Sequence, residues 1–198
     1  MSALTAELIT TLLDTSERNL ARYRRTYRPL ARTAFDRTVS RAGRNDGPAL
    51  LFDLYFGRTL DLSRSDMAGV VADVWSDAEY PARAFDDPQI WTHLFVANGY
   101  SHDGEKADRP TESVVLYRGC THEGRFGMSW TSDVEMARRF AYGGLRGRAQ
   151  GQVYTAVVAP EHLLAYIGER SGRGESEYVV DPSGLSDHNV TVLSGGAR

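Results

Sequence analysis

Two glutamates separated by one residue, Glu175 and Glu177, follow a glycine-rich loop and begin an apolar run. In a β-strand the side chains of residues i and i+2 point to the same face of the sheet, so these two carboxylates are predicted to lie side by side. Two negative charges on one face repel each other, which costs free energy unless a positive group lies close to them. Such a pair suits chemistry on a cationic species, either an oxocarbenium-like carbon or a guanidinium group. Taken alone, the pair is more simply explained as a solvated junction between a loop and a strand.

Two further polar motifs precede the glutamates. Arg118 ends a short apolar run and is followed by Gly119. A planar guanidinium in that place suits a bidentate grip on a phosphate or carboxylate. Ser129 and Thr131 alternate on a second predicted strand, where hydroxyl groups can hold a carboxylate or a sugar hydroxyl. Together the three motifs favour binding of NAD and opening of its N-glycosidic bond. The arginine would bind the diphosphate, the hydroxyl groups would orient the reacting groups, and a glutamate carboxylate would lie beside the sugar.

The three motifs occur in the order Leu-Tyr-Arg-Gly, Ser-Trp-Thr-Ser-Asp and Glu-Ser-Glu-Tyr-Val-Val, and the second leads into Ala-Arg-Arg-Phe-Ala. In this order the chain resembles the Arg–Ser–Glu class of mono-ADP-ribosyltransferases, which has toxin and phage members. The resemblance covers residues 113–193, and no comparable resemblance is found for residues 1–112.

The resemblance implies a role for each matching residue. Glu177 would hold the ribose 2′-hydroxyl and stabilise the oxocarbenium-like centre as nicotinamide leaves, an electrostatic contribution that is usually large. Glu175 would orient or deprotonate the acceptor, and a glutamate at this position goes with arginine as the acceptor. Arg118, with Gly119, would bind the NAD diphosphate and the nicotinamide-side ribose.

Other implied roles concern the nicotinamide pocket. Ser129 and Thr131 would shape this pocket and orient the catalytic carboxylate. Ser132 is a further member, because the run of hydroxyls permits a one-residue shift of the alignment. Phe140 matches a position where the family places an aromatic ring near nicotinamide, and packing in the core is the alternative for it. Residues 168–174 would form the loop that presents the target.

The first part of the chain is predicted to be helical. Leucines and tyrosines at helical spacing predict a helix over residues 3–30, and residues 31–42 predict a second that ends near Gly43. The segment 65–76 predicts another helix, with Ser65 as its cap.

The clearest helix lies between a capping aspartate, Asp87, and a terminating glycine, Gly99, and covers residues 88–98. Its apolar stripe is predicted to be core and consists of Ile90, Trp91, Leu94 and Phe95. The polar residues 99–112 predict a boundary or a loop.

The second part is mostly strand, with predicted strands at 113–118, 126–131, 152–158, 176–180 and 189–193. A capping box that begins at Ser132 predicts a helix through about Tyr142, and Pro160–Tyr166 predicts a short helix. Helices followed by strands indicate an α+β fold. The helix content and the polar boundary near residue 105 predict a helical N-terminal region, 1–105, packed as one unit with residues 106–198. For residues 106–198 the resemblance implies a mixed β-sandwich core of the ADP-ribosyltransferase type.

Composition narrows the class of protein. The formal charge is −3, and no apolar run approaches the roughly 20 residues of a membrane span. The N-terminus lacks the pattern of a secretory signal, so the cytoplasm is expected, or the host cytoplasm if the protein is phage-encoded. One cysteine, Cys120, excludes a disulfide framework and a cysteine-based zinc site, and the histidines have no metal-ligand spacing, so no metal is expected.

The leading hypothesis is transfer of ADP-ribose from NAD, as co-substrate, to an arginine of an unidentified protein. An NAD glycohydrolase, with water as acceptor, is one alternative. A non-catalytic nucleotide-binding module is another, in which residues 1–46, with nine arginines and five acidic residues, bind a partner. Nucleic acid is a possible partner of this basic segment, and a solvated helix face is its simplest explanation.

Overall fold

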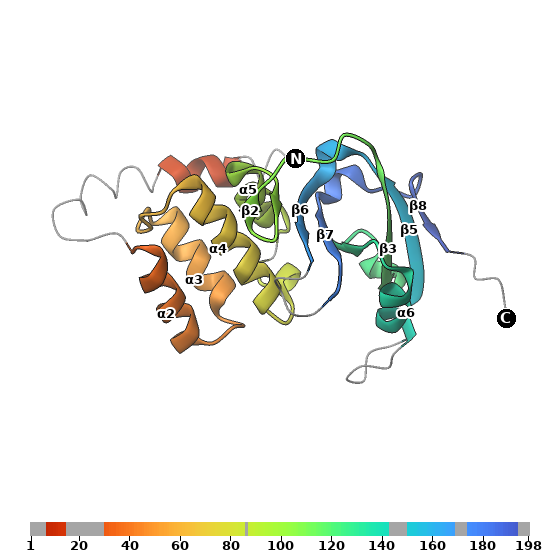
Figure 1. The fold of residues 1–198 in the computed structure, drawn as a ribbon, viewed down its shortest axis with the longest axis horizontal. Helices are drawn as coiled ribbons and strands as arrows, with labels where there is room; N and C mark the ends of the chain where they lie inside the picture. Colours follow the sequence, from red (N-terminus) through yellow and green to blue (C-terminus); the bar gives the residue numbers. More distant parts are fainter. Residues whose placement is uncertain (1–6, 15–29, 86, 143–149, 169–173, 194–198) are drawn as a thin grey trace. The chain divides into compact units, whose positions relative to one another are not determined.

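The computed structural model describes residues 7–14, 30–85, 87–142, 150–168 and 174–193 (Figure 1). The fold is α+β, as predicted, with most helices in the N-terminal part and a mixed sheet after them. The chain divides into two compact units, the first formed by Met1–Gly99 with Gly104–Lys106 and the second by Tyr100–Asp103 with Ala107–Arg198.

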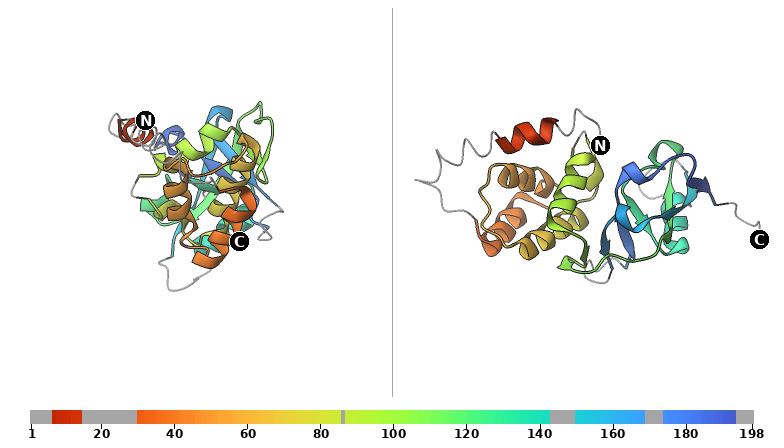
Figure 2. Two further views of the ribbon diagram at one scale, coloured as in Figure 1. Left: turned by 90° about the vertical axis from the view of Figure 1, so that its left-hand side faces the viewer. Right: turned by 90° about the horizontal axis from the view of Figure 1, so that it is seen from above.

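The first unit is a group of short helices, and its α-helices after residues 7–14 are packed in chain order, each against the next (Figure 1 and Figure 2). Besides residues 7–14, they are α2 (Arg32–Ala42), α3 (Gly47–Phe56), α4 (Arg64–Asp77) and α5 (Gln89–Asn98). The helices predicted over 31–42, 65–76 and 88–98 are therefore confirmed to within one residue at each end. Within the described part of the chain, no helix combines the length and the apolar character needed to cross a membrane.

Two details of the predicted helices are wrong. The cap of α4 is Ser63 rather than Ser65, because the Ser63 side chain accepts a hydrogen bond from the Asp66 N–H at 3.0 Å. Leu30, the predicted end of the first helix, forms an isolated parallel bridge with Leu60 instead. Residues 15–29 of that predicted helix lie outside the described residues.

Aromatic side chains form the core of the first unit. Trp75 and Trp91 pack edge to face with ring centroids 5.1 Å apart, and the Trp91 indole donates to the Pro81 carbonyl at 2.8 Å. The indole N–H is therefore satisfied although the ring is fully buried. The predicted core stripe of α5 is confirmed, since all four members are buried: Ile90, Trp91, Leu94 and Phe95.

The second unit is built on a mixed sheet. Its strands are β1 (Ser101–His102), β3 (Val114–Cys120), β4 (Ser129–Thr131), β5 (Gln152–Val158), β6 (Leu163–Ile167), β7 (Glu177–Val180) and β8 (Val190–Val192), whereas β2 (Glu105–Lys106) belongs to the first unit. The order is β1-β6-β7-β4-β3-β5-β8, and β1 and β6 are parallel while the other neighbours are antiparallel.

The short helix predicted over Pro160–Tyr166 is wrong. Only Pro160–His162 form a single 3₁₀ turn, and the chain continues as strand β6. Strand β6 pairs with β1, which is distant in the sequence, on one side and with β7, the next strand along the chain, on the other, so pairing within the sheet overrides the local preference. The strand predicted over 126–131 is shorter than expected, because only Ser129–Thr131 pair.

Helix α6 (Val134–Tyr142) packs on one face of β3 (Figure 1). A side chain at Gly119 would collide with the carbonyl oxygen of Ala137, so only glycine lets helix and strand approach this closely. The opposite face carries the main core of the unit, whose buried members come from both halves of the sheet and include Leu116, Tyr154, Trp130, Leu163 and Val180.

Candidate functional site

A row of side chains crosses β3, β4 and β7 and includes Glu177. In the register of the sheet, Tyr117 of β3 lies opposite Thr131 of β4, and Thr131 lies opposite Glu177 of β7. Cross-strand partners point to the same face, and Ser129 shares this face because it stands two residues before Thr131. The fold thus brings together Ser129, Thr131 and Glu177, which are separated in the sequence. We call the face that carries them the glutamate face.

Glu177 is buried, with 9% of its surface exposed, and Thr131 is buried beside it. A carboxylate in such surroundings interacts more strongly with a nearby charge than one in water does, because the effective dielectric constant is lower. The position of Glu177 therefore suits electrostatic stabilisation of a cation.

Glu175 lies outside strand β7, which begins at Glu177. Between the two glutamates, Ser176 has the left-handed backbone conformation, with φ at 45°. The two glutamates are therefore not residues i and i+2 of one strand, so the alternation on which their expected side-by-side arrangement was based does not apply to them. Two hydrogen bonds hold the turn: the Thr131 hydroxyl donates to the Glu175 carbonyl at 2.7 Å, and the Ser132 N–H donates to the Ser176 carbonyl at 3.3 Å.

The Thr131 hydroxyl also accepts a hydrogen bond from the Asp133 N–H at 3.0 Å. Asp133 in turn caps α6, because its Oδ1 accepts from the main-chain N–H groups of Glu135 and Met136 at 2.8 and 3.3 Å. The predicted cap, Ser132, is therefore one residue too early, and its side chain is exposed. Thr131 connects the end of β4, the start of α6 and the backbone next to Glu175.

Arg118 lies on the other face of β3, because neighbouring residues of a strand alternate and Tyr117 is on the glutamate face. Its guanidinium is bound to main-chain oxygens: Nε donates to the Gly124 carbonyl at 2.8 Å, and Nη1 donates to the Ser129 carbonyl. A side chain at Gly127 would collide with this guanidinium. The group expected to bind a diphosphate thus holds the segment leading into β4 against β3.

The other predicted residues are placed as follows. Gly119 is on the glutamate face, where α6 covers it. Phe140 is on α6 but 41% exposed, so the alternative of core packing is wrong for it; Ala137 and Ala141 make the buried contact of that helix. Residues 169–173 of the predicted target loop lie outside the described residues.

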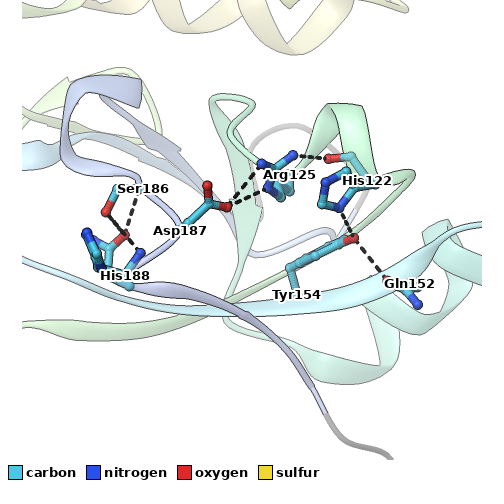
Figure 3. A network of polar contacts seen from close by, with 8 residues as sticks. His122, Arg125, Gln152, Tyr154, Ser186, Asp187 and His188 are labelled. Carbon is cyan, nitrogen blue, oxygen red and sulfur yellow. Dashed lines mark hydrogen bonds and ion pairs between the residues drawn. The ribbon is translucent and has the colours of Figure 1, made fainter.

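The sequence gives no sign of a polar network that is centred on Arg125 and Tyr154 (Figure 3). Arg125 donates to Oδ1 of Asp187 at 3.0 and 3.2 Å and to the His122 carbonyl at 2.9 Å, and its guanidinium lies 4.1 Å from the centroid of the Phe126 ring. The Tyr154 hydroxyl donates to Gln152 at 3.0 Å and lies 3.4 Å from Nδ1 of His122. These contacts hold the turn His122–Gly124, whose Gly124 carbonyl accepts a hydrogen bond from Arg118. No local sequence pattern predicts them.

Cys120 follows Arg118 on the same face and is half-buried. Burial raises the pKa of this thiol, and the nearby Arg118 guanidinium opposes the shift without cancelling it. The thiol is therefore a poor nucleophile at neutral pH. Among the described residues, no group of three or more histidine, cysteine, aspartate or glutamate side chains is arranged to hold a metal ion.

Comparisons of the chain with protein-family models, with curated proteins and with solved structures gave no match. Function is therefore inferred from the motifs and the geometry of this chain.

Proposed function

We propose that this protein is an NAD-dependent mono-ADP-ribosyltransferase, which cleaves the nicotinamide N-glycosidic bond and transfers ADP-ribose to an arginine of a protein. One observation carries the proposal. Thr131 is the cross-strand neighbour of Glu177 and hydrogen-bonds the main chain of Glu175, 44 residues away in the sequence. The hydroxyl motif and the glutamate motif therefore form one site. The second unit would be a β-sandwich core of the ADP-ribosyltransferase type.

Glu177 has the central role in this reaction. The bond between ribose C1′ and the nicotinamide nitrogen breaks, its electron pair leaves with the now neutral nicotinamide, and positive charge develops on the ribose. The buried carboxylate of Glu177 stabilises this charge and accepts a hydrogen bond from the ribose 2′-hydroxyl. Because the charge exists only as the bond breaks, this interaction lowers the barrier rather than tightening substrate binding.

Glu175 serves the acceptor. A guanidinium must lose a proton before its nitrogen can form the new bond to C1′, and the Glu175 carboxylate receives that proton. The left-handed turn at Ser176 interrupts the strand between the two glutamates. This turn separates the carboxylate that faces the sugar from the one that faces the acceptor.

Arg118 contributes by holding the main chain of Ser129 in place. Two carbonyls occupy two of its five N–H groups. Because Arg118 points to the face opposite Glu177, the proposal gives it this supporting role and does not include the contact with the NAD diphosphate that the resemblance implies.

The test uses labelled NAD, with agmatine as a small guanidine acceptor. Nicotinamide release and ADP-ribosyl-agmatine are measured together. Glu177→Gln removes the charge but keeps the shape, so both rates should fall by about 100-fold or more. The matched control is Glu161→Gln at an exposed glutamate, which should leave both rates unchanged. The proposal fails if the wild-type protein releases no nicotinamide, or if Glu177→Gln retains full activity.

Glu175→Gln separates transfer from hydrolysis. Loss of a general base typically costs about 100-fold or more, so transfer to agmatine should fall by that factor while slow nicotinamide release to water persists. If water is the natural acceptor, the wild-type protein will yield free ADP-ribose and no agmatine product.

A further inference from the structure

Glu177 has a cross-strand neighbour on each side. Thr131, the last residue of β4, lies on one side, and Ile167, the last residue of β6, lies on the other. Glu177 is itself the first residue of β7, so it belongs to the terminal pair of both ladders. The ends of paired segments open more readily than their centres. The position of this carboxylate therefore depends on the contacts that hold the chain at the ends of β4 and β6.

At the end of β6 these contacts come from Asp103. Its N–H donates to the Tyr166 carbonyl at 2.8 Å, and Oδ1 of its carboxylate accepts from the Gly168 N–H at 2.7 Å. The two bonded residues lie directly before and directly after Ile167. Because their main-chain groups point toward β1 and its end, alternation along the strand directs the main-chain groups of Ile167 the other way, toward Glu177.

The side chain of Asp103 takes the place of a further strand residue. Strand β1 ends at His102, and Asp103 has a φ of 51°, in the left-handed region. The ladder between β1 and β6 therefore stops before Gly168, whose N–H is bound by the carboxylate instead. Aspartate is one of the few residues that both adopt this backbone conformation readily and carry an acceptor.

The bond from Gly168 lies in closely packed surroundings. Gly168 is buried, and a Cβ at this residue would lie 2.7 Å from a ring carbon of Tyr166. Removing the Asp103 carboxylate therefore takes from a buried N–H an acceptor that water does not readily replace. The other carboxylate oxygen, Oδ2, lies 3.5 Å from Nε2 of His102, and an ionised acceptor makes a stronger hydrogen bond than a neutral one.

We propose that Asp103 is a positioning residue for Glu177. It holds the residues on both sides of Ile167, and the pair of Ile167 with Glu177 carries this constraint across β6 to the start of β7. Thr131 has the corresponding role at the end of β4. Asp103 acts through the main chain and touches neither NAD nor the acceptor.

This inference rests on the proposed function, in which the Glu177 carboxylate stabilises the charge that develops on the ribose. Such stabilisation requires the carboxylate to be in place before the bond breaks. A displacement of about 1 Å, caused by a change far from the reacting atoms, can lower a rate by about 100-fold. A loose end of β6 would therefore lower the rate of the chemical step.

Asp103→Gly is the principal variant. Glycine removes the carboxylate and adopts the left-handed conformation without strain. The kcat of nicotinamide release should fall about tenfold at an unchanged KM for NAD, because the lost constraint affects the transition state and not the contacts of bound NAD. Asp103→Asn keeps an oxygen acceptor and tolerates the same φ, so it should restore most of the rate.

The matched control is Asp181→Ala in the same unit. The Asp181 carboxylate accepts from the Ser183 N–H at 2.9 Å, just beyond the other end of β7. This variant therefore also loses a hydrogen bond between a carboxylate and a main-chain N–H, but not at the end that carries Glu177. It should keep the wild-type kcat and KM, whereas a general loss of stability would lower kcat in both variants alike.

Amide hydrogen exchange, measured by NMR, tests the constraint on Glu177 without the reaction. The amides of Ile167 and Glu177 should exchange about tenfold faster in Asp103→Gly than in the wild type, and at the wild-type rate in Asp103→Asn and Asp181→Ala. Asp103→Ala provides a second deletion of the carboxylate if Asp103→Gly does not fold.

Three results would each overturn the role of Asp103. They are unchanged exchange at Glu177 in Asp103→Gly, a kcat in Asp103→Gly equal to that in Asp181→Ala, and a kcat in Asp103→Asn as low as that in Asp103→Gly. If the wild-type protein releases no nicotinamide, the transferase proposal fails, and the exchange rates still decide whether Asp103 holds Glu177 in place.

Discussion

The hydroxyl of Thr131 donates to the carbonyl of Glu175 at 2.7 Å, across 44 residues of sequence. The same oxygen accepts from the Asp133 N–H at 3.0 Å, and Thr131 is paired with Glu177 across the sheet. The Thr131 side chain therefore holds the main chain of Glu175, before Ser176, and lies beside Glu177, after Ser176. The relative placement of the two glutamates depends on it.

Thr131→Val should lower both stability and activity. Valine has nearly the same shape but leaves the Glu175 carbonyl and the Asp133 N–H without their partner. We expect a loss of about 1–3 kcal/mol in the free energy of unfolding, measured by urea titration. Nicotinamide release should fall by about tenfold, because the Glu175 backbone is no longer held. Thr131→Ser keeps the hydroxyl and should retain most of both properties; equal losses in Val and Ser variants would contradict this role for the hydroxyl.

Ser176→Gly should stabilise the protein. A non-glycine residue in the left-handed region raises the free energy of the folded state by roughly 1–2 kcal/mol. Glycine adopts a φ near 45°, the value at Ser176, without this cost. Because glycine is also more disordered in the unfolded chain, the expected net gain is at most about 1 kcal/mol. Ser176→Val should have the opposite effect. Unfolding in urea measures both, and a less stable glycine variant would show that the serine side chain itself holds the turn.

Arg118→Lys should destabilise the second unit although the charge is kept. Lysine lacks the planar fork that reaches the Gly124 and Ser129 carbonyls together. We expect a loss of about 1–3 kcal/mol, with Arg139→Lys on the exposed side of α6 as the neutral control. A variant as stable as the control would show that the two carbonyls do not need the guanidinium.

The stability of the first unit should depend on pH through His93. Burial lowers the pKa of this histidine below its ordinary value of 6.5, and its ring stacks on Phe56 and lies 3.4 Å from the Tyr55 hydroxyl. The unfolded chain therefore binds the proton more readily than the folded chain. Stability from this group is complete above pH 6.5 and is lost as pH falls through the lowered pKa.

Urea unfolding between pH 5 and 8 measures this dependence. His93→Gln should remove that part of the slope, and His188→Gln at an exposed site should leave it intact. A slope that persists in His93→Gln would assign the dependence to another group.

Sequence patterns predicted the elements that depend on local signals. Strand 152–158 and helix 31–42, with a glycine after it, match the structure closely. The sequence predicts a short helix over Pro160–Tyr166, whereas the structure pairs Leu163–Ile167 with β1, which is distant in the sequence, and with β7, the next strand along the chain. Pairing between distant segments has no local signature, so β6 could not be recognised from its own residues.

The candidate site shows the same limit. The hydroxyl and glutamate motifs are recognisable in the sequence, but the φ of 45° at Ser176 is stabilised by contacts with Thr131 and Ser132 that only the folded chain makes. Only the register of the sheet shows that Tyr117 and Glu177 share a face, and Arg118, the neighbour of Tyr117 in β3, therefore points to the other face.

Strand β7 places Glu177 on one face of the sheet and Tyr178 on the other, each in line with a row of partners. If the strand slipped by a single residue, the carboxylate and the phenol would exchange faces. The proposed active site would then lose Glu177 and the buried core would lose the ring of Tyr178 in one event, whether the slip came from an inserted or a deleted residue before the strand. The alignment of β7 is therefore a single condition for both the proposed chemistry and the packing of the second unit.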